Sequence, residues 1–155
     1  MEKTYTLRVA KVVAARLRAA GAHVVMTRDT DKTVSLSARP ALANKLRADA
    51  FISFHFDSSP EKNTASGITT YYYHKSTSLA LANALSDDVV GLPIPSKGVA
   101  FGDFLVIRDN QVPAVLMELG YINDKSDFKT ISSEKYPKEV ANAVYAGLTS
   151  YFATN

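Results

Sequence analysis

Two apolar stretches of this chain each end in an ionisable side chain. Residues 51–54 continue into His55, and residues 113–117 continue into Glu118. Nearly continuous apolar runs of this length are typical of strands covered on both faces. In open α/β sheets, ligands bind outside the carboxyl ends of the strands. A histidine and a glutamate at two such ends therefore indicate a metal site or an acid–base site.

The remaining periodicity predicts an alternation of helices and strands. Apolar residues at helical spacing predict helices over about 3–20, 36–48, 78–90 and 135–152. Short β-branched, aromatic or alternating runs predict further strands over 22–27, 68–73 and 104–107. Turn-forming residues predict a loop over 57–66 and an irregular segment over 91–98. This order predicts a single-domain α/β fold with a mostly parallel twisted sheet and helices on both faces.

Composition narrows the chemistry that such a site can use. The chain has 155 residues, which is enough for one packed core. It has no cysteine, so disulfides and thiolate metal sites are excluded, and a metal would need His, Asp or Glu. The net charge of +3 is spread along the chain and forms no nucleic-acid footprint, although it favours a polyanion such as a bacterial wall. We expect no nucleic-acid partner and no membrane span, and residues 1–20 show no signal peptide.

The residues alone leave two interpretations open for each candidate group. His55 is either a structural histidine that donates to a carbonyl, or a metal ligand or general base. Glu118 is flanked by apolar residues, and carboxylates are rarely buried without a partner. It is therefore either a general base or metal ligand, or one half of an ion pair with Arg28, Arg39 or Arg108.

Three other groups favour simpler explanations. Glu2 lies in the first turn of the first helix, where an acidic side chain complements the helix dipole. His23 and His74 have the positions of surface or packing histidines. No nucleophile elbow, glycine-rich phosphate loop or His-Glu-x-x-His motif is present. A metal-free hydrolase that uses a His55–Glu118 dyad would consequently lack a nucleophile.

Four stretches of the sequence resemble the zinc-dependent N-acetylmuramoyl-L-alanine amidases of the amidase-3 family. They occur in the family's order and cover almost the whole chain. They are the helix headed by Glu2 with Gly21–Asp31, the segment from Leu36 and Arg39 through Ala43-Asn44 to Ser53-Phe54-His55, Gly67-Ile68 with Tyr72-Tyr73, and Leu105–Arg108 with Pro113–Asn123.

The resemblance implies a role for single positions. Glu2 and His55 match zinc ligands of the family, and Glu118 matches its catalytic glutamate. The implied cofactor is Zn²⁺, and the implied reaction is hydrolysis of the amide bond between N-acetylmuramic acid and L-alanine in peptidoglycan. Asp57 and Arg108 are the substrate-binding residues that we expect beside this centre. The alternative is a non-catalytic peptidoglycan-binding domain of the same fold.

The chain also departs from the family pattern. The family has a further ligand histidine in a glycine-rich segment before the first helix, and neither His23 nor His74 stands in its place. We therefore expect residues 1–155 to be an N-terminally truncated amidase catalytic domain that lacks the family's first strand. Phe56-Asp57 replaces the family's usual Ala-Asn. The loop over 57–66 is too short for a blocking helix, so we expect an open groove in a monomeric, secreted autolysin of the bacterial cell wall or periplasm.

Overall fold

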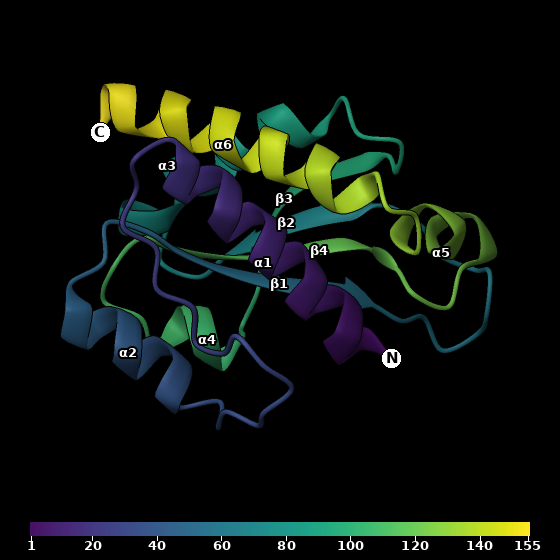
Figure 1. Ribbon diagram of the computed structural model, residues 1–155, viewed down its shortest axis with the longest axis horizontal. Helices are drawn as coiled ribbons and strands as arrows, with labels where there is room; N and C mark the ends of the chain where they lie inside the picture. Colours follow the sequence, from purple (N-terminus) through teal and green to yellow (C-terminus); the bar gives the residue numbers. More distant parts are fainter.

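An open four-stranded sheet organises the protein, whose computed structural model describes residues 1–155 (Figure 1). The strands are β1 (Phe51–Asp57), β2 (Ile68–Tyr72), β3 (Ser96–Phe101) and β4 (Ala114–Tyr121). Their order is β1-β4-β2-β3, with β1 parallel to β4, β3 parallel to β2, and β2 antiparallel to β4. The mostly parallel sheet is confirmed. The carboxyl ends of β1 and β4 meet at one edge, and β2 enters the sheet from that same edge.

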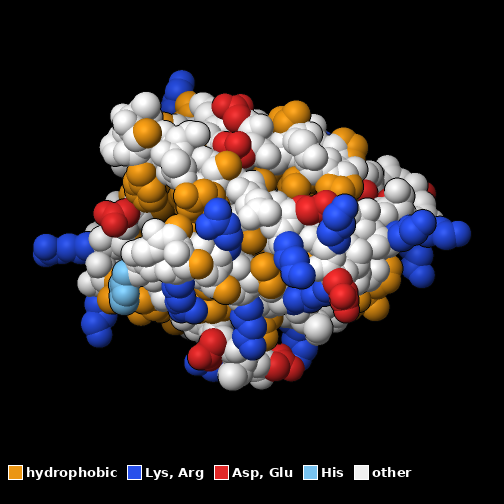
Figure 2. Space-filling view, turned by 45° about the horizontal axis from the view of Figure 1, so that its top comes forward, with side chains coloured by type: hydrophobic (Ala, Val, Ile, Leu, Met, Phe, Trp, Pro, Cys, Tyr) orange, Lys and Arg blue, Asp and Glu red, His pale blue; other side chains and the backbone are white.

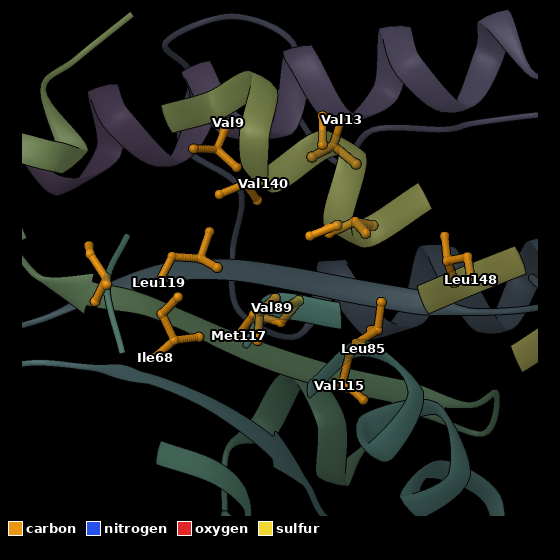
Figure 3. Close-up of a cluster of buried hydrophobic side chains, with 14 of the residues drawn as sticks. Val9, Val13, Ile68, Leu85, Val89, Val115, Met117, Leu119, Val140 and Leu148 are labelled. Carbon is orange, nitrogen blue, oxygen red and sulfur yellow. The ribbon is translucent and has the colours of Figure 1, made fainter. Parts of the chain in front are cut away.

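Three long helices cover one face of the sheet. They are α1 (Glu2–Ala19), α3 (Lys75–Val89) and α6 (Tyr136–Thr154). Alternate residues of β4 point into this layer, where they join the main hydrophobic cluster (Figure 3). Its members include Val9, Val13, Leu85, Val89, Val115, Met117, Leu119, Val140 and Leu148. Burying one side chain of this size stabilises the fold by about 1.5–3 kcal/mol, so this face provides most of the core.

Two shorter helices, α2 (Ala38–Leu46) and α4 (Leu105–Arg108), lie on the opposite face (Figure 1). A smaller cluster forms there from Val106, Ile107, Ala114 and Leu116, with Phe51, Tyr71 and Tyr73 packed against it. Because Phe51 and Ala114 begin β1 and β4, this cluster covers the part of the sheet near the amino ends of these strands. Helices on both faces are confirmed, but they cover the two faces unequally.

The sequence did not predict α5 (Lys125–Ile131), which follows β4 directly. Its Asp127 is 2% exposed, and its carboxylate accepts hydrogen bonds from Ser66 Oγ at 2.6 Å, Gly67 N at 3.2 Å and Tyr121 N at 2.9 Å. Three donors satisfy a buried carboxylate that would otherwise be costly to desolvate. Asp127 therefore ties the beginning of β2 and the end of β4 to α5.

Two predicted strands are wrong. Residues 22–27 pair with no strand, since the alternating pattern favours an extended chain but pairing needs a neighbour. Residues 104–107 fall in α4, because a short apolar run does not distinguish a helical turn from a strand. The segment predicted as irregular over 91–98 instead contains the beginning of β3 at Ser96.

Basic side chains are spread over the face that α1 and α6 present, with acidic and apolar groups between them (Figure 2). None of the helices combines the length and the hydropathy required to cross a lipid bilayer.

Candidate active site

His55 and Glu118 are direct neighbours on adjacent parallel strands. The register of β1 and β4 pairs Phe51 with Ala114 and, four residues on, His55 with Glu118. Side chains two or four residues apart on a strand share a face. Both ionisable groups consequently lie on the face of α2 and α4, beyond the part that the smaller cluster covers.

The first turn of α1 brings Glu2 to this pair. The amino end of α1 lies beside the carboxyl end of β1 (Figure 1). Glu2 Oε1 lies 3.2 Å from His55 Nδ1 and accepts a hydrogen bond from Phe56 N at 3.3 Å. The hydrogen bonds from His55 and Phe56 hold the pKa of Glu2 below its usual range, although partial burial opposes them. Arg28 fixes the same turn by donating to Lys3 O at 2.7 Å.

Ser53 holds the other side of the His55 ring. Its Oγ lies 3.0 Å from His55 Nε2, and Ser53 is buried on the same face of β1. Both ring nitrogens are therefore engaged, one by a carboxylate and one by a hydroxyl. A hydroxyl adapts to either imidazole tautomer, because it both donates and accepts. Sequence analysis did not identify Ser53, although its place two residues before His55 on a strand was a usable signal.

Glu118 is half-buried, and its Oε2 is shielded from solvent with no hydrogen-bond partner. Burial raises the pKa of Glu118 to about 7; the charges of Asp57 and Glu2 act in the same direction, and that of His55 opposes them. Glu118 forms no ion pair, so the alternative pairing with an arginine is wrong. Arg28 and Arg39 donate to backbone carbonyls, and Arg108 pairs with aspartates. A carboxyl of this pKa can take up or release a proton near neutral pH.

Glu2 and His55 present a partial donor set for a metal ion. The 3.2 Å between Glu2 Oε1 and His55 Nδ1 is close to the edge of a zinc tetrahedron, about 3.3 Å for metal–ligand bonds near 2.0–2.1 Å. Carboxylate oxygen and imidazole nitrogen are also ligands that zinc accepts. The described chain contains no group of three or more His, Asp or Glu side chains positioned around one ion. Two donors fit zinc, and they form an incomplete set by themselves.

The two residues predicted to bind substrate lie in different places. Asp57 ends β1 beside Glu118, and its charge acts on Glu118, Tyr71 and Tyr121. Arg108 instead lies at the end of α4, where it forms ion pairs with Asp103 at 2.9 Å and Asp109 at 3.1 Å. The structure therefore brings Asp57 to the candidate centre and shows no contact between Arg108 and this centre.

Two tyrosines, Tyr71 and Tyr121, border the centre. Burial raises the pKa of Tyr71 and that of Tyr121, and the carboxylates of Asp57 and Glu118 contribute to both shifts. Tyr71 shares a face with Thr69, the cross-strand partner of Glu118. Alternation along β2 puts Tyr71 on this face and Tyr72 on the other.

His23 is exposed, whereas His74 precedes α3 and its Nε2 lies 2.7 Å from Arg108 O. Two hollows flank His74, with volumes of about 800 and 500 Å³. Neither hollow is lined by Glu2, His55 or Glu118. His23 and His74 therefore have the surface and packing roles that the sequence favoured.

Comparison with known proteins relates the chain to N-acetylmuramoyl-L-alanine amidases. Residues 1–150 match the amidase-3 family, described as N-acetylmuramoyl-L-alanine amidase. The probable cell wall amidase LytH of Staphylococcus epidermidis is 37% identical over 155 residues, which cover 99% of this chain and 51% of that protein. The uncharacterized protein YqiI of Bacillus subtilis is 36% identical, with 97% and 74% covered. The chain spans about half the length of the LytH proteins that it matches.

Solved structures share the fold. An N-acetylmuramoyl-L-alanine amidase from Clostridium difficile 630 superposes with a TM-score of 0.93 at 32% identity, covering 100% of this chain and 86% of that one. The catalytic domain of CwlV, an amidase from Bacillus (Paenibacillus) polymyxa var. colistinus, gives a TM-score of 0.94 at 32% identity, with 100% and 87% covered. The family match over residues 1–150 and these shared folds show that the chain belongs to the amidase-3 family of N-acetylmuramoyl-L-alanine amidases.

Proposed function

We propose that the protein hydrolyses the amide bond between N-acetylmuramic acid and L-alanine in peptidoglycan, with zinc as cofactor. Membership of the amidase-3 family supports the reaction. One observation carries the assignment of the site. The carboxyl of Glu118, without a hydrogen-bond partner at Oε2, lies beside the Glu2–His55 pair at the carboxyl ends of two parallel strands.

Glu118 is the general base of this proposal. Its pKa of about 7 makes the carboxylate available at neutral pH, yet basic enough to accept a proton from an attacking water. The same carboxyl then donates this proton to the departing amine of L-alanine. Its Oε2 has no competing partner within the protein, so the acceptor is not already occupied.

Glu2 Oε1 and His55 Nδ1 are the proposed zinc ligands. Bound zinc would lower the pKa of a water and polarise the amide carbonyl. Ser53 Oγ holds the His55 ring from the far side and so keeps Nδ1 directed at Glu2. Asp57 adds negative charge beside the centre and is the proposed contact for a donor group of the substrate. The role of Arg108 in substrate binding stays a prediction.

The proposed place of action is the bacterial wall outside the cytoplasmic membrane, where the protein would work as a secreted autolysin. The cell-wall amidase relatives support this location. We propose a monomer, since one chain carries Glu2, His55 and Glu118 on one sheet edge.

The test is identification of the released product. Purified full-length protein is incubated with soluble muropeptides, with zinc or with EDTA, and the products are analysed by mass spectrometry. The proposal expects a zinc-dependent peptide with a free amine on L-alanine and a glycan with a free lactyl carboxyl. Cleavage at another bond would refute the proposed reaction, and full activity in EDTA would refute the role of zinc.

The two-donor set also supports a second candidate, a domain that binds wall peptide without cutting it. The same experiment separates the two functions. Retention of muropeptides by the immobilised protein, with no new amine after addition of zinc, would favour the binding domain. Release of the free L-alanine amine would exclude it.

A further inference from the structure

We infer that the substrate crosses this site in one direction, with its glycan over Tyr71 and Phe104 and its stem peptide toward Lys97. The inference rests on the proposed function and adds an orientation to it. Strand β2 serves as the reference, because its residues lie in order beneath the two surfaces. Thr69 pairs with Glu118 across the sheet, so the reacting bond belongs at the level of Thr69.

The aromatic surface lies on the C-terminal side of Thr69. Tyr71 follows on the same face at an interval of about 7 Å. It supports one phenylalanine, since the ring centroids of Tyr71 and Phe104 lie 5.1 Å apart. Phe104 is 37% exposed. Its ring thus presents apolar surface to solvent on the side of Thr69 toward which β2 runs.

The backbone is shaped to let the Tyr71 and Phe104 rings come together. Gly102 lies between Phe101 and Phe104 and is buried. A Cβ at Gly102 would lie 2.5 Å from the Phe104 ring and 2.9 Å from the Tyr71 ring, so a larger residue would separate the pair. Gly102 therefore keeps the Phe104 ring against Tyr71, on the face of the sheet that carries Glu118.

The cationic surface lies on the other side of Thr69. The side chain of Lys97 crosses Gly67, where an added Cβ would lie 2.5 Å from Lys97 Cδ. Its Nζ lies 5.3 Å from the centroid of the Tyr121 ring. Lys97 is exposed and forms no ion pair, so its ammonium is free to bind an anion from solution. Gly67 and Tyr121 direct this charge toward the edge of the sheet that carries Glu118.

The chemistry of the two substrate arms decides the direction. N-acetylated sugars whose lactyl group is in amide linkage carry no charge, and their pyranose rings have apolar faces that complement aromatic rings. The stem peptide beyond L-alanine is the arm that carries free carboxylates. A lysine ammonium pairs with a carboxylate by charge-assisted hydrogen bonds. The uncharged arm accordingly belongs over Tyr71 and Phe104, and the anionic arm belongs beside Lys97.

The test measures binding in the Glu118→Gln background by calorimetry, and KM in the parent protein. Three ligands are compared: a muramoyl peptide with a free α-carboxylate on the second stem residue, its carboxamide, and the carboxylate form extended by a disaccharide. Lys97→Ala is expected to weaken binding of the carboxylate ligand about tenfold and to leave binding of the carboxamide unchanged. Phe104→Leu, which keeps apolar packing, is expected to cancel most of the gain, about three- to tenfold, from the added disaccharide.

Matched variants are Lys138→Ala, an exposed lysine on α6, and Phe152→Ala, a phenylalanine that is 46% exposed near the end of α6. Equal losses for carboxylate and carboxamide, or a Lys97 effect that grows with glycan length, would overturn the orientation while the amidase proposal stands. A parent protein that neither binds nor cleaves these ligands would overturn the proposed function and the orientation together.

Discussion

The two faces of β4 differ in what their side chains do, although the residues alternate along one strand. Met117 is fully buried beneath α1, α3 and α6. Glu118, the next residue, points to the opposite face, where α2 and α4 cover only the part of the sheet near Leu116. The difference shows how one strand can anchor the core with one set of residues and position an ionisable group with the other. Unequal helix cover is what leaves the second set accessible.

The largest expected effect is the loss of catalysis when Glu118, on the face of β4 that carries the candidate site, is altered. Glu118→Gln keeps the size of the side chain and removes the proton acceptor, so kcat for muropeptide cleavage should fall by about 10²- to 10⁴-fold. Steady-state product release, measured by mass spectrometry, checks this value. The matched control is Glu134→Gln, an exposed glutamate in the segment before α6, which should leave kcat unchanged. A loss below tenfold would remove Glu118 from the role of general base.

The next effect is a loss of stability when the face of β4 that packs into the main hydrophobic cluster is altered. Met117→Ala removes a fully buried side chain from the main cluster and should lower the free energy of unfolding by about 2–5 kcal/mol. Urea denaturation followed by circular dichroism measures this loss. The comparison with Glu118→Gln is decisive, because the neighbouring position should not destabilise the protein. Similar destabilisation by both substitutions would contradict the division of roles between the faces.

The third effect is a dependence of stability on pH. Glu118 has a pKa of about 7 in the folded protein against 4.5 for the ordinary group, so the metal-free folded state retains a proton that the unfolded chain releases. The contribution of Glu118 should be constant below pH 4.5, should decline by at most about 3 kcal/mol up to pH 7, and should then level off. Denaturation in EDTA across this range should show a smaller decline for Glu118→Gln. Identical pH profiles for the two proteins would contradict the raised pKa.

The smallest effect tests the support of His55. Ser53→Ala removes the hydroxyl that holds Nε2, and loss of such an outer partner typically weakens metal binding by about 10- to 100-fold. Zinc competition with a chromogenic chelator measures the change in affinity. Ser58→Ala, at an exposed serine just after β1, is the control. An unchanged zinc affinity in Ser53→Ala would show that Ser53 contributes to packing and does not support His55 as a zinc ligand.

Local patterns accounted for the parts of the molecule that depend on neighbours along the chain. Nearly continuous apolar runs placed His55 and Glu118 near the carboxyl ends of buried strands, and the pairing of β1 with β4 makes the two residues neighbours. Helical periodicity likewise predicted α1 and α6 to within about two residues. These features follow from burial of one side of each element, which is visible in the order of apolar residues.

Features that depend on distant contacts were not visible in the same way. The residues alone gave Glu2 a helix-dipole role, because its contact with His55 joins positions 53 apart and depends on how α1 packs. Only the family resemblance suggested this contact. The strands predicted over residues 22–27 and 104–107 are wrong for a related reason. A short apolar run becomes a strand only when another strand lies beside it.

The carboxylate of Asp127 affects how the segments next to the candidate site move. It accepts from the amides of Gly67 and Tyr121 and from the hydroxyl of Ser66, which belong to the segment before β2 and to the end of β4. Loss of one of these donors would weaken the hydrogen bonds that the Asp127 carboxylate forms with the other two. The entrance to β2, the exit from β4 and the following helix are thereby joined in one cooperative unit, whose amide protons should exchange with deuterium as a group.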